Sequence, residues 1–231
     1  MRTVILNLKG FMERLEDLGL GIKIYQDDEL YCFTSDSVLL SKFARVKNGD
    51  VVADFCAGSG IVGFNLYSLN QKLIKSVTLF EMQTPLYQLS KKSIEYNALN
   101  DKFTAINIRL QDLGTAYAGK FSLIVCNPPY MEKGRGFTEE NKMIAVCRTE
   151  LELSLTELVS AISTALKFGG RINMVHRADR LVDVICEFKK NNIEPKRIQF
   201  VSGGKKEPYL FMIEGVKGGK SGVKIHNTLI N

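Results

Sequence analysis

The feature that most constrains the fold is a regular alternation of strand-type and helix-type segments that begins after the first fifty residues. Short apolar runs typical of buried strands occur at 51–56, 76–82 and 121–127, and segments with helical periodicity follow them, such as 84–100 and 150–168. Strands that alternate with helices favour a mostly parallel sheet covered by helices on both faces. The sequence therefore predicts an α/β fold with a doubly wound sheet.

The two ends of the chain depart from this alternation. Segments 196–202 and 208–216 are joined by only a short loop, so we expect them to pair as an antiparallel C-terminal edge, followed by a polar tail that includes His226. Near the start, 22–26 and 29–33 flank Asp27-Asp28, which predicts a hairpin. The next segment, TSDSVLLSKFARV, begins with capping residues and predicts a short amphipathic helix.

Composition bounds the size, the compartment and the metal content of the protein. With 231 residues, of which 45% are hydrophobic, the chain can bury one sizeable core. We therefore predict an N-terminal extension, residues 1–50, and one main domain, residues 51–231. There is no long apolar stretch and charge appears too early for a signal peptide, which predicts a cytoplasmic protein without a membrane partner. The five cysteines are scattered without a C-x-x-C pair, so neither a disulfide framework nor a metal site is expected.

The formal net charge of +6 is unevenly distributed. Lysines and arginines gather in segments expected to be loops, namely MEKGRG, FKKNNIEPKR, GGKKEP and VKGGKSGVK. Several basic loops on one face suit a polyanionic partner such as a nucleic acid.

A glycine-rich turn follows the first strand of the alternation. In VVADFCAGSGIVG, the glycines Gly58, Gly60 and Gly63 have the spacing G-x-G-x-x-G, which serves dinucleotides and also S-adenosylmethionine. Such a turn lets the backbone approach a ligand at a helix N-terminus. Asp54, just before the turn, suits a ligand with a charged amino group, which the NAD pattern does not require.

Two further carboxylates follow the next strands of the predicted sheet. Glu81 ends the second strand, where it can accept hydrogen bonds from ribose hydroxyls. Asp112 comes after the third strand, at a position suited to an adenine edge. Together with the turn, these side chains predict a site for a nucleotide-containing cofactor.

The tetrapeptide Asn127-Pro128-Pro129-Tyr130 ends the fourth strand. Two prolines stop a strand and stiffen the backbone, so they can hold the Asn127 side-chain oxygen and the Pro128 carbonyl as neighbouring acceptors. Two acceptors match the two hydrogens of a planar amino group such as adenine N6, and they give its nitrogen sp3 character for attack on a methyl sulfonium. Tyr130 is suited to stack on a flat substrate. We predict that these four residues are catalytic.

These motifs resemble known methyltransferases. DFCAGSG together with NPPY is similar to class I S-adenosylmethionine methyltransferases that act on exocyclic or amide nitrogens. The phrases ERLEDLGLGIKIYQ, FTSDSVLLSKFA, CRTE and GGKKEPYLFMIEGVKGG resemble the bacterial tRNA1(Val) adenine-N6 methyltransferase family, which modifies the adenosine 3′ to the anticodon. The resemblance implies a Rossmann-like class I fold, S-adenosylmethionine as cofactor and tRNA as substrate.

The resemblance also assigns roles to residues. It places Asp54, Gly58 and Gly60 at the methionine end of the cofactor, Glu81 at the ribose, Asp112 at the adenine, and Asn127, Pro128, Pro129 and Tyr130 at the target base. Cys56 belongs to the same cofactor turn, but it stands where most relatives carry a glycine, so a less permissive turn is expected. Thr149 stands where the family pattern has His.

Other functions share parts of this pattern. The same tetrapeptide fits an rRNA guanine-N2 methyltransferase or a release-factor glutamine-N5 methyltransferase, although the latter carries a larger N-terminal domain. From different classes, the glycine turn alone fits an NAD-dependent oxidoreductase, and the basic loops fit a non-catalytic RNA-binding module. Neither of these last two gives the tetrapeptide a role.

Overall fold

The computed structural model describes residues 3–6, 12–27, 30, 35–129, 153–204 and 206–231. The strands are β1 (Thr3–Leu6), β2 (Met12–Gly19), β3 (Ile22–Asp27), β4 (Asp50–Phe55), β5 (Ile74–Glu81), β6 (Phe103–Asn107), β7 (Phe121–Cys126), β8 (Leu166–Arg177), β9 (Ile193–Ser202), β10 (Pro208–Lys217) and β11 (Lys224–Ile230). The helices are α1 (Ser35–Phe43), α2 (Ile61–Asn70), α3 (Thr84–Tyr96), α5 (Leu155–Ala165) and α6 (Leu181–Lys190), with short 3-10 turns η1 (Leu110–Asp112), η2 (Thr115–Tyr117) and η3 (Ala178–Arg180).

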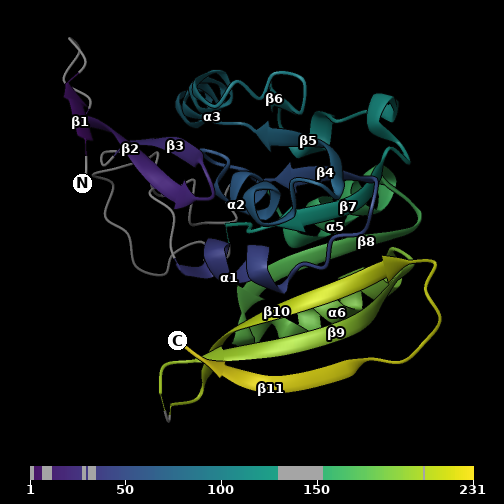
Figure 1. The fold of residues 1–231 in the computed structure, drawn as a ribbon. Helices are drawn as coiled ribbons and strands as arrows, with labels where there is room; N and C mark the ends of the chain where they lie inside the picture. Colours follow the sequence, from purple (N-terminus) through teal and green to yellow (C-terminus); the bar gives the residue numbers. More distant parts are fainter. Residues whose placement is uncertain (1–2, 7–11, 28–29, 31–34, 130–152, 205) are drawn as a thin grey trace.

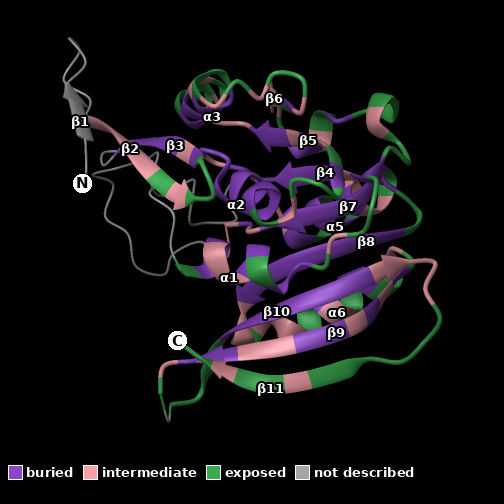
Figure 2. Ribbon diagram, viewed as in Figure 1, coloured by how far each residue is buried: buried purple, intermediate pink, exposed green. Residues whose placement is uncertain are grey.

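An eight-stranded sheet lies between two layers of helices (Figure 1). Its strand order is β11-β9-β10-β8-β7-β4-β5-β6, and the run from β8 to β6 is parallel. One apolar cluster packs α1 and α2 on one face, and a second packs α5 and α6 on the other. Every residue of the central strand β7 is buried, as expected for a strand covered on both faces (Figure 2). The predicted doubly wound α/β fold is confirmed.

The helix expected over 150–168 is shorter than predicted. Among the described residues it begins at Leu155 and ends at Ala165, because Leu166 already pairs with Phe121 in the sheet. Ser154 caps this helix through a capping box with Glu157. The first positions of β8 after Leu166 are exposed, so the sequence there lacks the apolar pattern of a buried strand and does not mark where the helix ends.

The C-terminal edge is more elaborate than the sequence suggests. The segments 196–202 and 208–216 do pair antiparallel, as β9 and β10, but β10 lies between β9 and β8. The expectation that these two strands form the edge of the sheet was wrong, because Lys224–Ile230, in the expected polar tail, forms β11, which pairs parallel to β9 at the edge. Most of β11 is exposed (Figure 2), so its sequence lacks the apolar alternation that marks a half-buried strand.

An N-terminal hairpin is present, but at a different position. It joins β2 to β3 across Leu20 and Gly21, whereas Asp27-Asp28 was expected to form the turn. The expected second arm, 29–33, lies almost wholly outside the described residues. The hairpin docks on α3, where the Tyr25 backbone N–H donates to Ser93 Oγ at 2.9 Å. The predicted short helix is confirmed as α1, and the division of the chain at residue 50 stays a prediction.

A buried ion pair fixes the amino ends of the central strands. Arg171 Nη2 donates to both carboxylate oxygens of Asp50, at 2.6 and 2.7 Å, and Ser122 Oγ donates to the same carboxylate at 2.7 Å. These residues tie β8, β4 and β7 together at the end opposite the residues predicted to be functional. Among the described helices, none combines the length and apolar character that a membrane crossing requires.

Candidate active site at the carboxyl ends of the central strands

Three neighbouring strands of the sheet, β5, β4 and β7, deliver the predicted site residues to one edge. Asp54 lies at the end of β4, Glu81 ends β5, and Asn127 follows β7. Phe55 of β4 pairs with Cys126 of β7, so the cofactor turn and the tetrapeptide leave adjacent strands at the same level. The structure thus brings Asp54, Glu81 and Asn127 to one edge of the sheet.

Asp54 is fully buried beneath the N-terminus of α2. Its Oδ2 accepts a hydrogen bond from the Gly63 backbone N–H at 2.8 Å, whereas Oδ1 has no hydrogen-bond partner within the described part of the chain. Glycine suits position 63, because a Cβ there would lie 2.6 Å from Leu79 Cδ2 and 3.2 Å from Asp54 Oδ2, so neighbouring side chains would have to shift. One carboxylate oxygen is therefore held by the turn, and the other is buried with its hydrogen-bonding capacity unused by the described residues.

The environment of Asp54 disfavours its charged form. Burial is the largest cause and raises the pKa of Asp54 from 3.8 to about 8; the Gly63 N–H opposes this shift and the nearby Glu81 carboxylate adds to it. Burial also raises the pKa of Glu81, against the hydrogen bonds from backbone N–H groups. Two buried carboxyl groups with raised pKa values mark this edge of the sheet as a candidate functional site.

The cofactor turn leaves free space beside the backbone of Gly58, where a ligand is expected to contact it. At Gly58, whose φ is 57°, a Cβ would meet no atom of the described residues within 4 Å. Cys56 adopts the same left-handed region with a φ of 58°, which costs a non-glycine residue about 1–2 kcal/mol. The turn was predicted to be less permissive with cysteine than with glycine at position 56, and the left-handed φ of Cys56 is a strain of that kind. Its side chain packs against the apolar cluster that contains Cys126.

Glu81 connects the turn to the end of β5. Its Oε2 accepts from the Gly58 N–H and its Oε1 accepts from the Gln83 N–H, each at 2.8 Å. A carboxylate has about four lone-pair positions, so both oxygens keep capacity for ribose hydroxyls. Asp112 lies apart from this network, exposed at the end of η1. Its predicted contact with an adenine stays a prediction.

The sequence reasoning missed Asn107, which supports the same half of the site. Asn107 ends β6, and its Nδ2 donates to the backbone oxygens of Glu81 and Met82, at 2.8 and 2.9 Å. These bonds fix the chain where it leaves β5. An asparagine that ends a strand beside a predicted ligand residue is the signal that could have indicated it.

The tetrapeptide contributes a second buried acceptor. Asn127 Nδ2 donates to Ser37 Oγ of α1 at 3.0 Å, while Oδ1 is buried without a hydrogen-bond partner among residues that the structure describes. Pro128 and Pro129 continue without regular structure, and Tyr130 lies outside the described residues. An unpartnered buried amide oxygen is unfavourable in the protein alone, so it fits a role in binding a donor.

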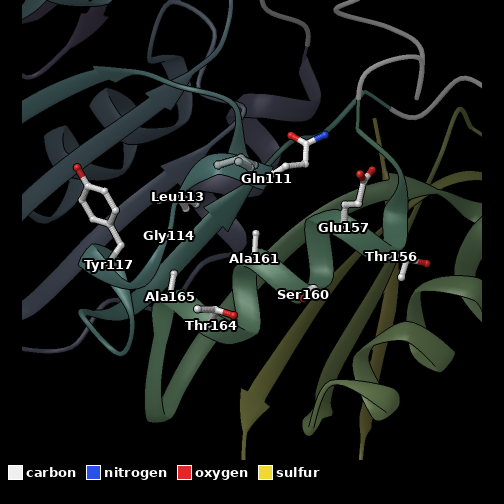
Figure 3. A pocket seen from close by; sticks show the side chains of 11 residues that line it. Gln111, Leu113, Gly114, Tyr117, Thr156, Glu157, Ser160, Ala161, Thr164 and Ala165 are labelled. Atoms are coloured by element: carbon white, nitrogen blue, oxygen red, sulfur yellow. The ribbon is translucent and has the colours of Figure 1, made fainter.

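A separate pocket of about 480 Å³ lies beside this site (Figure 3). It is formed by η1, η2 and α5, and Tyr117, Glu157 and Thr164 are among its lining residues. Asp54, Glu81 and Asn127 do not line it. The described residues contain no group of side chains suited to hold a metal ion. Burial lowers the pKa of His176 to about 4, so this histidine is neutral at pH 7 and is a weaker base than an ordinary imidazole.

Comparisons with known proteins identify the family of the chain. Residues 33–181 match the family model described as methyltransferase small domain. A protein from Shewanella putrefaciens named tRNA1(Val) (adenine(37)-N6)-methyltransferase is 28% identical over 163 residues, which cover 68% of this chain and 66% of the relative. The match thus spans slightly less than two thirds of that relative. A protein of the same name from a Flavobacteriaceae bacterium is 25% identical over 189 residues, covering 76% of this chain and 78% of the relative.

The fold has counterparts among solved structures. A predicted O-methyltransferase from Agrobacterium tumefaciens superposes with a TM-score of 0.67 at 16% identity, covering 84% of this chain and 86% of that one. The class I methyltransferase fold expected from the sequence is confirmed by this likeness. Because the family model spans more than half of the chain and includes Asp54, Glu81 and Asn127, the protein belongs to the methyltransferase small domain family, whose cofactor is S-adenosylmethionine.

Proposed function

We propose that the protein transfers the methyl group of S-adenosylmethionine to the exocyclic N6 of an adenosine in tRNA, at position 37 of tRNA1(Val). The observation that carries this proposal is the buried Oδ1 of Asn127, which accepts no hydrogen bond from any described residue. It lies at the end of β7, next to the strand that leads into the cofactor turn. The name of the Shewanella relative supports the choice of tRNA and of adenine.

The residues of the turn fit S-adenosylmethionine. The available oxygen of Asp54 is suited to the cofactor's ammonium group, the open side of Gly58 admits a close backbone contact, and Glu81 retains acceptor capacity for ribose hydroxyls. When bound, the cofactor supplies a methyl group on a positively charged sulfur. Asp54 and Glu81 would orient it by charge and hydrogen bonding, with Asp112 at the adenine.

Asn127 would act on the amine that receives the methyl group. Its Oδ1 accepts one N–H of the amino group, and we propose that the Pro128 carbonyl accepts the other, so that the nitrogen lone pair leaves conjugation with the ring. The nitrogen then forms the new N–C bond, the sulfur keeps the electrons of the broken S–C bond, and water takes the proton that the methylated nitrogen loses. Tyr130 is proposed to stack on the base.

The test is methylation of purified tRNA with labelled S-adenosylmethionine, followed by mass spectrometry of the nucleosides. We expect N6-methyladenosine in tRNA1(Val), and none in a matched transcript in which adenosine 37 is replaced by guanosine. Label found only as N2-methylguanosine, or only in release-factor glutamine, would contradict the substrate. Displacement of the cofactor by NAD but not by S-adenosylhomocysteine would contradict the methyltransferase assignment for this chain, and RNA binding without any transfer would favour a non-catalytic module.

A further inference from the structure

The orientation of the Asn127 side chain depends on a residue far away in the sequence. Ser37 of α1 lies 90 positions before Asn127, and its Oγ accepts the hydrogen bond from Nδ2 at 3.0 Å. Ser37 is 1% exposed, so water does not compete for this contact. This is the bond that fixes which end of the amide faces away from the helix.

An amide group has a donor end and an acceptor end, and only one of them suits the proposed chemistry. An oxygen directed at a substrate amine accepts its N–H, whereas an NH2 group in the same place would compete for the nitrogen lone pair. Since the two orientations differ by a rotation about one bond, a partner for Nδ2 decides which one is populated. Ser37 supplies that partner.

The helix that carries Ser37 is itself firmly held. Leu40 is fully buried, and Phe43 at the end of the helix is buried as well. At the end of the helix, the backbone oxygen of Phe43 accepts from Arg197 Nη2 at 2.7 Å. A group mounted on a packed helix can hold a catalytic side chain more accurately than a group on a loop.

We propose that Ser37 is a positioning residue, which holds the Asn127 amide with Oδ1 directed at the substrate amino group. This inference rests on the proposed function, and it assigns a part of the active site to the predicted N-terminal extension. Ser37 does not touch the reacting atoms, so it acts through Asn127 alone. Its removal should therefore slow methyl transfer without weakening cofactor binding.

The experiment compares Ser37→Ala, Ser37→Thr and Ser41→Ala in single-turnover transfer at saturating substrate, with S-adenosylhomocysteine affinity measured by calorimetry. Ser41 is the matched control, because it is equally buried on the same helix and bonds an asparagine outside the site. We expect Ser37→Ala to be roughly 10- to 100-fold slower, the cost of a misplaced catalytic group, with affinity unchanged within about twofold. Ser37→Thr, which keeps the hydroxyl, should recover most of the rate, and Ser41→Ala should keep it.

A double-mutant cycle separates positioning from general destabilisation. In the Asn127→Ala background, Ser37→Ala should have no further effect on the rate, because the two residues act as one unit. A wild-type rate in Ser37→Ala, or a full additional loss in the double variant, would overturn the proposal while the proposed function stands. A wild-type protein that methylates no nitrogen would overturn the proposed function itself, and the positioning role with it.

The hydrogen bond also has a readout that needs no substrate. The side-chain NH2 resonances of Asn127, assigned by their loss in Asn127→Ala, should exchange slowly with solvent in the wild type and in Ser37→Thr. They should exchange faster in Ser37→Ala. Equal exchange in all folded variants would show that Ser37 does not restrain the amide.

Discussion

The cofactor half and the substrate half of the site are supported in different ways. Asp54 and Glu81 are held by backbone N–H groups of the turn itself and of the next residues, at separations of 9, 23 and 2 positions. Asn127 is held by a side chain 90 positions away. The cofactor half is thus built by strands β4 and β5 and the turn that follows β4, whereas the substrate half needs the N-terminal helix to be packed in place.

The largest expected effect, and the strongest test of whether the two halves are independent, is the loss of methyl-transfer rate in Asn127→Ala. Asn127→Ala should lower kcat by about 10²- to 10³-fold, the loss typical of one preorganised polar group, because the amine loses its acceptor. Cofactor affinity should change little, since Asp54 and Glu81 keep their partners. Single-turnover rates and calorimetry measure the two quantities separately. A large loss of cofactor affinity in this variant would show that the two halves are not independent.

The next effect concerns the pH dependence of stability in the cofactor half. The pKa of Asp54 is about 8 in the folded chain, whereas its ordinary value is 3.8. Its contribution to the free energy of unfolding is therefore fully present below pH 4 and is lost as the pH rises through 8. Between these pH values the free energy of unfolding should fall by about 1.4 kcal/mol per pH unit. Asp54→Asn should remove this slope from denaturant unfolding curves of the cofactor-free protein.

Glu81 also has a raised pKa, so a smaller slope of the same sign should remain in Asp54→Asn. Saturating S-adenosylmethionine should reduce the slope in the wild type, because an ammonium partner stabilises the Asp54 carboxylate. An unchanged slope in Asp54→Asn would assign the pH dependence to other groups.

Asn107 provides the counterpart of Asn127 in the cofactor half. Asn107→Ala removes two hydrogen bonds to the backbone at Glu81 and Met82, so cofactor affinity should fall roughly five- to tenfold, for about 1 kcal/mol of net interaction. Transfer at saturating cofactor should stay near the wild-type rate. If methyl transfer became slower while cofactor affinity stayed normal, Asn107 would instead belong to the substrate half.

The smallest expected effect is at the strained residue of the turn. Cys56→Gly should stabilise the protein by about 0.5–1 kcal/mol, as relief of the left-handed strain exceeds the entropy that glycine adds to the unfolded chain. Ala98→Gly is the matched control, because Ala98 has a φ of 52° on an exposed turn after α3. If thermal unfolding shows a gain for Ala98→Gly alone, packing of the Cys56 thiol offsets the strain.

The sequence predicted the elements whose periodicity or turn residues act locally. The strands around the sheet centre, the glycine turn and the segment Asn127–Pro129 all fall where expected, because glycine, proline and apolar runs restrict the backbone by themselves. Ser37 and Asn107 were missed because each acts through a side-chain contact that only the folded chain creates. The β11 strand was missed for a third reason, since an exposed edge strand needs no apolar pattern.

The position of β10 between β8 and β9 has a consequence for the order of folding. Both sheet neighbours of β9, namely β10 and β11, follow it in the sequence. Until β10 has paired with β8, β9 therefore has no native neighbour in the sheet and both of its edges are unpaired. Unpaired strand edges are sites of association with other chains, so a folding intermediate that lacks β10 is the species most exposed to aggregation.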